Sequence, residues 1–322
     1  DKLDRPETHG ILELGGASTQ ICFEEKEGSI LQNHYKLELG PGLVWNLYAR
    51  SFLLYGIHQV GQRFEALLLE SVDLNTTKSV RNPCLPQNAT QQLDTKIRID
   101  QNGTETWGSG QQPSYPIAEN KQGIDFDLCQ SMVQTLIHKD MNEWCTFAYQ
   151  DHCSFGGSYM PSLPSNPSPP FIGVSNYYEV WDFLGLSEKS SIRELENASK
   201  FVCGLNHEEA KEYGKKKKVP KDLRDEMCFS SLYVLELLRH GYGFRDDDYI
   251  MTADYINQRQ VTWALGAMIY EVNSLPWKVH QTNQQVWLAI LLVLAVIGLL
   301  LVLLFNNCSR RIRLYHIVKS DE

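Results

Sequence analysis

Residues 10–22 of the chain read GILELGGASTQIC. The apolar run up to Leu14 predicts a short buried strand, Gly15–Gly16 predict a tight turn, and the residues from Thr19 onward predict a second strand. A Gly-Gly turn between two strands is more often a plain hairpin than a binding site. The first expectation is therefore a strand–turn–strand unit, and any function must come from the polar residues around it.

The polar residues around this turn are of the types that bind phosphate and a cation. Glu13 precedes the turn, and Ser18, Thr19 and Gln20 follow it. Two glycines without a Cβ let the turn reach positive φ and let backbone N–H groups approach an anion. A carboxylate can hold a divalent cation directly or through its waters. The local chemistry suggests a phosphate-and-metal turn, with the simple hairpin as the alternative.

The string GILELGGASTQ as a whole closely resembles the fourth conserved region of the ecto-nucleoside triphosphate diphosphohydrolases, or apyrases, usually written DLGGASTQ. Further likenesses follow in order down the chain: SFLLYG at 51–56, NPC at 82–84, DFDLC at 125–129, CSFGG at 153–157, GYGF at 241–244 and VTWALGAM at 261–268. The resemblance implies an α/β fold, namely an actin-like (ribonuclease H-like) phosphohydrolase lobe followed by a C-terminal transmembrane helix.

Length and charge agree with such a protein. The 322 residues allow about two domains and an ample core. The 30 basic and 39 acidic residues give a net charge of −9, which argues against a nucleic-acid-binding surface. The chain begins at Asp1 without a methionine or a signal peptide, so we expect either a processed product or a missing N-terminal part.

An uncharged apolar segment, VWLAILLVLAVIGLLLVLLF at 286–305, lies near the C-terminus. It is long enough to cross a hydrocarbon core of about 30 Å. Basic residues cluster after it, so the positive-inside rule places the following tail in the cytosol and residues 1–285 outside the cell or in a lumen. Four glycosylation sequons lie on the predicted outer side, at Asn75, Asn88, Asn102 and Asn197.

The predicted organisation has five parts. They are the second lobe of the actin-like fold (1–255), a helix returning to the missing first lobe (256–276), a juxtamembrane linker (277–285), the span (286–305) and the cytosolic tail (306–322). Hydrophobic spacing predicts helices at 43–70, 125–139 and 231–240, the last ended by Gly241, and a buried helix at 261–272 with Gly266 at a close contact. Residues 71–124 are polar and predict an excursion with a few short strands.

Seven of the eight cysteines precede the span and none forms a CxxC pair, which argues against a zinc cluster. The resemblance implies the disulfides Cys145–Cys153, Cys203–Cys228 and Cys84–Cys129, and it leaves Cys22 as a buried free thiol.

The resemblance also implies roles for residues at the turn. The backbone of Gly15, Gly16, Ala17 and Ser18, together with the Ser18 hydroxyl, would cradle phosphate. Gln20 would help to orient the attacking water, and Glu13 would hold the water shell of Ca²⁺ or Mg²⁺.

Three residues outside the turn receive roles in the same way. Tyr178 would stack on the nucleobase, with Glu179 as the alternative at the family position. Arg224 would supply a cation over the other face of the base, and Trp263 would help to order the nucleotide site. From the residues alone, an aromatic run such as 175–184 is usually core and a lone arginine is usually solvated.

The sequence departs from the family pattern in two ways. Glu13 stands where the family usually has aspartate, and it is one methylene longer. The family's first phosphate turn and its glutamate base would precede the residues present here. We therefore expect these 322 residues alone to hydrolyse nucleotides poorly or not at all.

The resulting hypothesis is divalent-cation-dependent hydrolysis of nucleoside tri- or diphosphates by water attack on the terminal phosphate, with the catalytic part extracellular. The alternatives are a catalytically inactive membrane glycoprotein that acts as a binding module, and a Golgi-type nucleoside diphosphatase of the same topology. The expected partners are the nucleotide, the lipid bilayer and the missing N-terminal lobe. Nucleic acid is excluded, and a homo-oligomer is left open.

Overall fold

A computed structural model of the chain describes residues 7–25, 32–40, 43–70, 72–99, 105–107, 115–137, 153–164, 170–256, 259–274 and 279–318. The chain divides into two compact units, Asp1–Thr262 and Trp263–Glu322. The first unit is a mixed α/β lobe, and the second contains helices α8 (Trp263–Ser274) and α9 (Val279–Val318).

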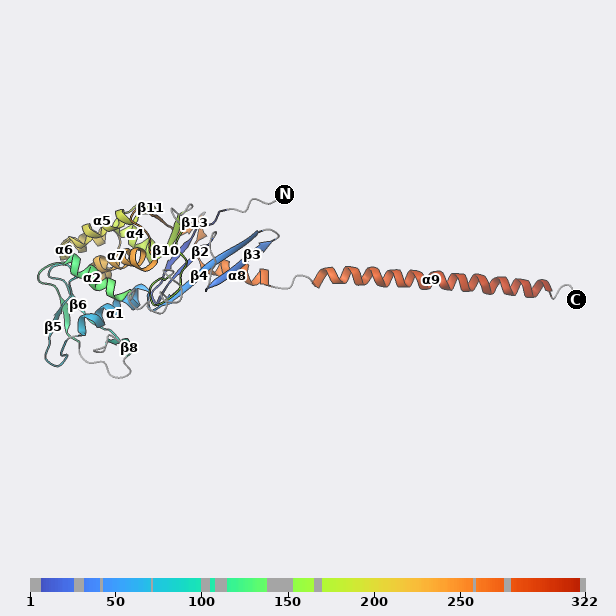
Figure 1. The fold of residues 1–322 in the computed structure, drawn as a ribbon, viewed down its shortest axis with the longest axis horizontal. Coiled ribbons are helices and arrows are strands. Elements are labelled where there is room, and N and C mark those ends of the chain that lie inside the picture. Colours follow the sequence, from blue (N-terminus) through green and yellow to red (C-terminus); the bar gives the residue numbers. More distant parts are fainter. Residues whose placement is uncertain are drawn as a thin grey trace. The chain divides into compact units, whose positions relative to one another are not determined.

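A seven-stranded mixed sheet forms the centre of the first unit (Figure 1). Its order is β11 (Lys189–Ser191), β12 (Tyr249–Thr252), β10 (Phe171–Ser175), β1 (Ile11–Leu14), β2 (Ser18–Glu24), β4 (Leu43–Leu53) and β3 (His34–Gly40). Strands β1, β10 and β12 run parallel, whereas β2 runs antiparallel to β1. The carboxyl ends of the parallel strands therefore share one edge, which is where ligands bind in many α/β sheets.

The helices of the first unit include one buried helix, α7 (Met227–Glu236). The others are α1 (Ile57–Leu69), α2 (Phe126–Leu136), α4 (Asn176–Leu184), α5 (Ile192–Cys203) and α6 (His207–Lys216), with a 3₁₀ turn η2 (Lys221–Glu226) and a π-helical turn η3 (Leu237–Tyr242). Helix α7 contacts α2, α4 and α5, and its Leu232, Tyr233 and Val234 are fully buried. Figure 1 shows α4, α5, α6 and α7 gathered together beside β10.

The predicted excursion at 71–124 is built from short strands, as expected. β5 (Ser79–Arg81), β9 (Ile117–Glu119) and β6 (Thr90–Gln92) form one small sheet, and β7 (Ile97–Ile99) pairs with β8 (Glu105–Trp107). Arg63 of α1, which is 2% exposed, reaches Glu105 of β8 with Nε–Oε1 2.8 Å. This ion pair joins the excursion to the core.

Two of the three predicted disulfides are present. Cys84–Cys129 links the excursion to α2, and Cys203–Cys228 links α5 to α7. Cys153 is disulfide-bonded, but its predicted partner Cys145 lies outside the described residues. Cys22 is free, as predicted, although it is half-buried rather than buried, and burial raises the pKa of its thiol to about 11.

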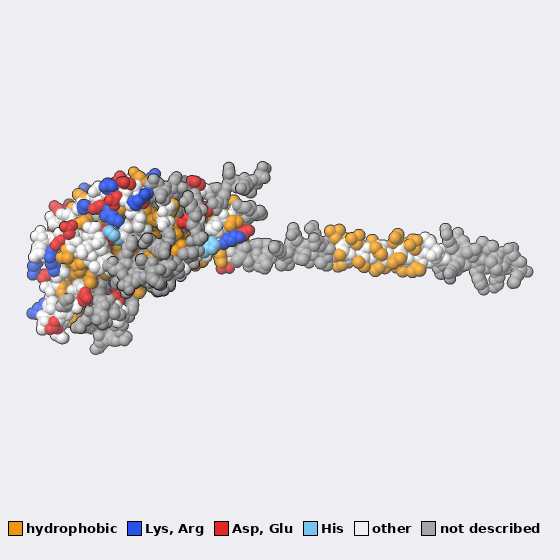
Figure 2. Space-filling view, viewed as in Figure 1, with side chains coloured by type: hydrophobic (Ala, Val, Ile, Leu, Met, Phe, Trp, Pro, Cys, Tyr) orange, Lys and Arg blue, Asp and Glu red, His pale blue; other side chains and the backbone are white. Residues whose placement is uncertain are grey.

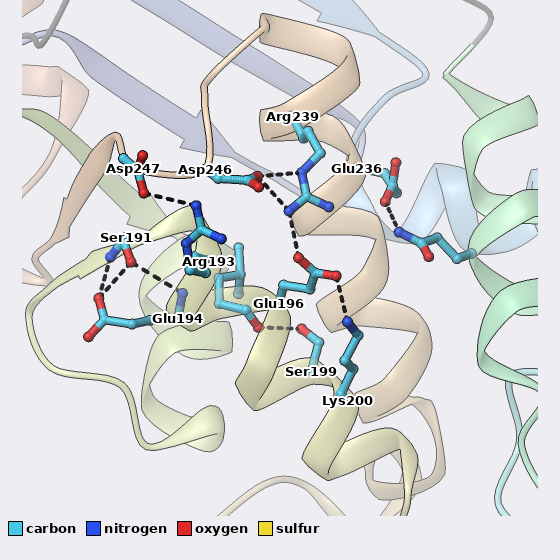
Figure 3. Close-up of polar contacts among 12 residues, drawn as sticks. Ser191, Arg193, Glu194, Glu196, Ser199, Lys200, Glu236, Arg239, Asp246 and Asp247 are labelled. Atoms are coloured by element: carbon cyan, nitrogen blue, oxygen red, sulfur yellow. Dashed lines mark hydrogen bonds and ion pairs between the residues drawn. The ribbon is translucent and has the colours of Figure 1, made fainter.

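Charged side chains fix helix α5 against the chain after η3 (Figure 3). Ser191 and Glu194 form a capping box at the start of α5. Arg239 donates to Glu196 of α5 at 2.8 Å and to Asp246 at 2.7 Å. The first half of helix α5 is therefore held by its capping box and by the ion pair with Arg239.

The prediction of one helix over 43–70 is wrong for its first half. Residues Leu43–Leu53 form strand β4, which pairs with both β2 and β3, and only Ile57–Leu69 form a helix. The strand buries Trp45, Tyr48 and Phe52, and such aromatic side chains favour a pleated surface when neighbouring strands are available. Apolar spacing alone did not separate the two elements.

The two helices that follow in the chain differ less from their predictions. The helix expected at 125–139 is present as Phe126–Leu136, with Asp125 accepting a capping hydrogen bond from Leu128 N. The helix expected at 231–240 belongs to a longer segment that begins at Met227 and ends at Gly243, not Gly241. This segment is buried on all sides and is not amphipathic, because it lies at the centre of the helical layer.

The second unit contains both predicted C-terminal helices. Residues Trp287–Asn307 of α9 are long and apolar enough to cross a membrane, with a mean hydropathy of 3.4, and Figure 2 shows the continuous apolar surface of this segment. The prediction that α8 is buried is wrong for the described chain. Trp263 is 85% exposed, and a Cβ on Gly266 would meet no atom within 4 Å. An apolar helix of this kind needs a partner surface that its own unit does not supply among the described residues.

Candidate functional site

The turn between β1 and β2 is a true hairpin, as predicted. Gly15 N donates to Ser18 O at 2.9 Å, and Glu13 lies opposite Gln20 in the ladder. Neither Gly15 nor Gly16 has a positive φ, so the expected use of their conformational freedom is wrong. Gly16 is needed instead for close approach, because a Cβ there would lie 2.9 Å from Nδ1 of His58.

The start of helix α1 packs directly on this turn. Ile57 N donates to Gly15 O at 2.9 Å, and His58 N donates to Gly16 O at 3.1 Å. Gly56 permits this contact, because a Cβ there would lie 2.3 Å from Ser18 N. The first N–H groups of the helix are therefore satisfied by the turn itself and do not serve as an anion site.

The N–H groups of the turn are placed differently. Those of Gly16 and Ala17 have no acceptor among the described residues, whereas the turn carbonyls accept from α1 and from Leu54 N. Successive backbone N–H groups in a turn form a concave donor site for an anion. The turn thus presents donors on one side while the helix holds it from the other.

Glu13 is held by a residue that the sequence analysis did not identify. Ser175, at the end of the parallel neighbour β10, donates from Oγ to Glu13 Oε1 at 3.0 Å. Burial raises the pKa of Glu13 above its ordinary value, and the hydrogen bond from Ser175 lowers it in part. Within the described part of the chain, no basic side chain pairs with this carboxylate.

Ser175 has an unusual backbone conformation, with φ 60° and ψ −129°. Such conformations cost roughly 1–3 kcal/mol in a residue with a side chain, and they cluster at functional sites. The next residue, Asn176, donates from Nδ2 to Leu14 O at 2.7 Å. Ser175 and Asn176 could have been predicted as site residues from the sequence, because they lie at the carboxyl end of a parallel strand.

Gln20 and Ser18 are brought together on the other side of the hairpin. Gln20 donates from Nε2 to Ser18 Oγ at 2.7 Å and to Ser51 Oγ at 2.8 Å. The amide nitrogen is therefore engaged, while the amide oxygen remains as an acceptor. Behind the turn, buried Thr19 donates to Glu13 O at 2.7 Å and lies 3.1 Å from the Tyr242 hydroxyl.

A cavity of about 450 Å³ lies between α1, α4 and η2. His58 and Asn176, which both touch the turn, line its near end. Tyr178 also lines the cavity and is 39% exposed. Arg224 does not line the cavity. Its Nε instead donates a hydrogen bond to Val219 O at 3.0 Å.

The remaining candidate residues lie in two different places, at the cavity and in the second unit. Glu179 lines the cavity beside Tyr178. Trp263 opens α8 in the second unit, so the site described here is built without it. Among the described residues there is no group of three or more His, Cys, Asp or Glu side chains that could hold a metal ion by itself.

The first unit has the fold of an actin-like lobe. A solved structure of nucleoside triphosphate hydrolases from Neospora caninum matches with a TM-score of 0.54 and 15% sequence identity, over 82% of this chain and 56% of that chain. At this identity the likeness shows the fold alone, a mixed α/β actin-like lobe.

The family follows from the sequence. The model of the GDA1/CD39 (nucleoside phosphatase) family matches residues 1–286, and the chain belongs to this family. It is 29% identical to ectonucleoside triphosphate diphosphohydrolase 2 of Gallus gallus, over 93% of this chain and 59% of that protein. It is 30% identical to ectonucleoside triphosphate diphosphohydrolase 1 of Bos taurus, over 85% and 52% respectively. The chain spans about half the length of the curated relatives it matches.

Proposed function

We propose that the full-length protein hydrolyses nucleoside tri- and diphosphates to a nucleotide and phosphate, and that this chain supplies one of the two lobes of the site. The observation that carries the proposal is the convergence of Glu13, the free turn N–H groups and the Ser18–Gln20 pair at one hairpin. Membership of a nucleoside phosphatase family supports the reaction class.

Each part of the turn has a distinct role in this proposal. The N–H groups of Gly16 and Ala17, with the Ser18 hydroxyl, bind oxygens of the terminal phosphate. Because the Gln20 nitrogen is occupied by Ser18 and Ser51, its oxygen accepts a hydrogen bond from the attacking water. The catalytic base and the facing phosphate turn belong to the other lobe.

The donor set around Glu13 fits a hard cation such as Ca²⁺ or Mg²⁺. A half-buried carboxylate that has no basic partner among the described residues, beside the Ser175 hydroxyl, offers oxygen ligands and gains from a positive charge. Most remaining ligands would be water and phosphate oxygens, which agrees with the absence of a larger ligand cluster among the described residues. When bound, the cation neutralises phosphate charge as attack proceeds.

The cavity next to the turn receives the nucleoside. Tyr178 is the proposed aromatic contact to the base, since it lines the cavity and is partly exposed. Arg224 would have to leave the Val219 carbonyl to reach the base, so its contribution requires a side-chain movement. Trp263 is proposed to order the site only in the presence of the first lobe.

The second unit is proposed to anchor the protein. The apolar segment Trp287–Asn307 supports a single membrane span, and the basic residues after it favour a cytosolic tail with the lobe outside the cell. The exposed apolar side chains of α8 support its return to the first lobe. The same topology would also suit a Golgi lumen.

One observation favours a second candidate, a binding module that has lost catalysis. Glu13 is longer than the aspartate usual in the family, and its carboxylate is already engaged by Ser175. A nucleotide would then be bound without turnover. Activity separates this candidate from the enzyme.

Phosphate release by the full-length parent protein in membranes tests the proposal. ATP, ADP and UDP are supplied with Ca²⁺ or Mg²⁺, with and without a chelator, to the parent, to Ser18→Ala and to Ser79→Ala. Ser79 is an exposed serine of β5 outside the site, and its variant serves as the matched control. We expect cation-dependent release that falls at least about tenfold in Ser18→Ala and is unchanged in the control.

Two results would count against the enzyme. Release that survives the chelator and the Ser18→Ala change would remove the turn from the mechanism. A folded, glycosylated protein that binds nucleotide but releases no phosphate would establish the binding module instead.

A further inference from the structure

The far wall of the cavity carries two carboxylates that share one amide. Gln91 of β6 donates from Nε2 to Glu65 Oε1 at 3.3 Å and to Glu226 Oε1 at 3.2 Å. All three side chains line the cavity, and we call them the acidic wall. They come from α1, the excursion and η2, which are distant in sequence.

The partners of the acidic wall leave one acceptor open. Glu65 also accepts from Asp94 N at 2.9 Å, and the Gln91 oxygen accepts from Asn82 Nδ2 at 3.2 Å. Glu226 has Gln91 as its one hydrogen-bond donor within the described part of the chain, which leaves its second oxygen without a donor. That oxygen belongs to a residue facing the cavity.

Both carboxyl groups of the acidic wall hold a proton more tightly than an exposed glutamate does. Burial raises the pKa of both carboxyl groups, that of Glu65 to about 7. Nearby Asp222 and Asp225 add to the rise at Glu226. When ionised, the Glu226 carboxylate accepts hydrogen bonds without donating any, so its open oxygen requires a donor from the ligand.

The acidic wall lies at the right distance from His58, which contacts the turn, for the edge of a base. His58, Gly61, Gln62 and Glu65 all line the cavity, and their spacing of three and four residues places them on one face of α1. The seven residues from His58 to Glu65 correspond to about 10 Å along the helix axis. A nucleoside whose 5′ phosphate lies beside His58 reaches about this far with the outer edge of its base, and the remaining phosphates then extend from His58 to the turn.

We propose that Glu226, held in place by Gln91 and Glu65, selects nucleotides whose base carries an amine at its outer edge over those with a carbonyl there. The inference rests on the proposed function, because it needs the phosphates to be bound at the turn. An amine donates to the open carboxylate oxygen, whereas a carbonyl would leave that oxygen unpaired and face it with another acceptor.

Two pairs of substrates isolate this group. ATP and ITP differ at C6 of the purine, and CTP and UTP differ at C4 of the pyrimidine, by an amine in place of a carbonyl, with a proton on the neighbouring ring nitrogen of the carbonyl-bearing member. The experiment measures kcat/KM for all four with the full-length parent protein in membranes. We expect the amine-bearing member of each pair to be preferred by at least about tenfold. This measurement needs no variant.

The variant Glu226→Gln then tests the residue itself. Its amide can turn to donate to a carbonyl, so both ratios should fall toward one. Asp222→Asn is the matched control, since it removes the same charge from the same turn while its exposed side chain does not line the cavity. The control should keep the ratios of the parent.

The outcomes separate the inference from the proposed function. Phosphate release from all four nucleotides without preference overturns the inference and leaves the proposed function standing. A preference that persists in Glu226→Gln removes Glu226 as its cause. Release from none of the four overturns the proposed function, and the selection falls with it.

Discussion

The two ends of the cavity are built from different material. Beside the near end, which His58 and Asn176 line, the hairpin presents backbone N–H groups within one stretch of a few residues, and α1 holds that stretch through its own first N–H groups. At the far end, the acidic wall consists of the side chains of Glu65, Gln91 and Glu226, which meet only after folding. The near end suits a group common to all nucleotides, and the far end suits the part that differs among them.

This difference indicates where the preference among nucleotides can change without loss of phosphate release. Backbone donors at the turn depend on close packing, which any added atom disturbs. The acidic wall depends on side-chain identity, so a single isosteric substitution can alter it. Substitutions at the near end should therefore affect turnover of every nucleotide, and those at the far end should affect choice among nucleotides.

The largest effect is expected at Gly56. Its Cβ in Gly56→Ala would lie 2.3 Å from Ser18 N and 2.4 Å from Ala17 N, and both are backbone atoms that cannot rotate away. The turn must shift, and we expect phosphate release by the full-length parent protein to fall by about a hundredfold or more for every nucleotide.

Gly61→Ala, on the same helix, is the stability control. A Cβ there meets no atom within 4 Å, so the substitution should raise the free energy of unfolding by about 0.5–1 kcal/mol through helix propensity. Equal behaviour of Gly56→Ala and Gly61→Ala in stability and turnover would contradict the close packing of the turn on α1.

A smaller effect is expected at Ser175. The variant Ser175→Gly relieves a positive φ, so stability should rise by about 1 kcal/mol. It also removes the hydroxyl that holds Glu13, so phosphate release should fall about tenfold. Asn33→Gly, which relieves a φ of 58° elsewhere, should leave release unchanged. Loss of both stability and release at Ser175 would mean that the conformation is not strained.

The smallest effect concerns Glu65 and pH. Its pKa in the folded protein is about 7, against an ordinary value of 4.5, because burial disfavours the charge. The folded state therefore binds the proton more tightly, and the stability that this confers is complete below about pH 4.5 and is lost as the pH rises through about 7. Glu65→Gln should reduce this pH-dependent decrease in the free energy of unfolding by up to about 3 kcal/mol.

Thermal unfolding of the purified full-length parent protein at several pH values measures this slope. Glu70→Gln changes an exposed residue at the end of the same helix and should keep the slope of the parent. An unchanged slope in Glu65→Gln would indicate that the acidic wall is more hydrated than its packing suggests.

The same contrast explains what the sequence could predict. The hairpin and the disulfide Cys203–Cys228 depend on local order or on a family pattern, and both predictions are confirmed. The acidic wall and the Ser175–Glu13 contact depend on strands and helices that are distant in the sequence. The spacing of residues along the sequence does not indicate that these elements meet. Strand β4 was mistaken for helix because its partners, β2 and β3, lie outside the window in which periodicity is read.

The cation dependence of phosphate release in Glu13 variants tests the central claim most directly. In the full-length parent protein, Glu13→Gln keeps the size of the side chain but removes its charge, whereas Glu13→Asp keeps the charge and restores the residue usual in the family. The account predicts that Glu13→Gln loses cation-dependent release by about a hundredfold or more while Glu13→Asp retains it. Release by Glu13→Gln at the rate of the parent, with the same Ca²⁺ and Mg²⁺ dependence, would contradict it.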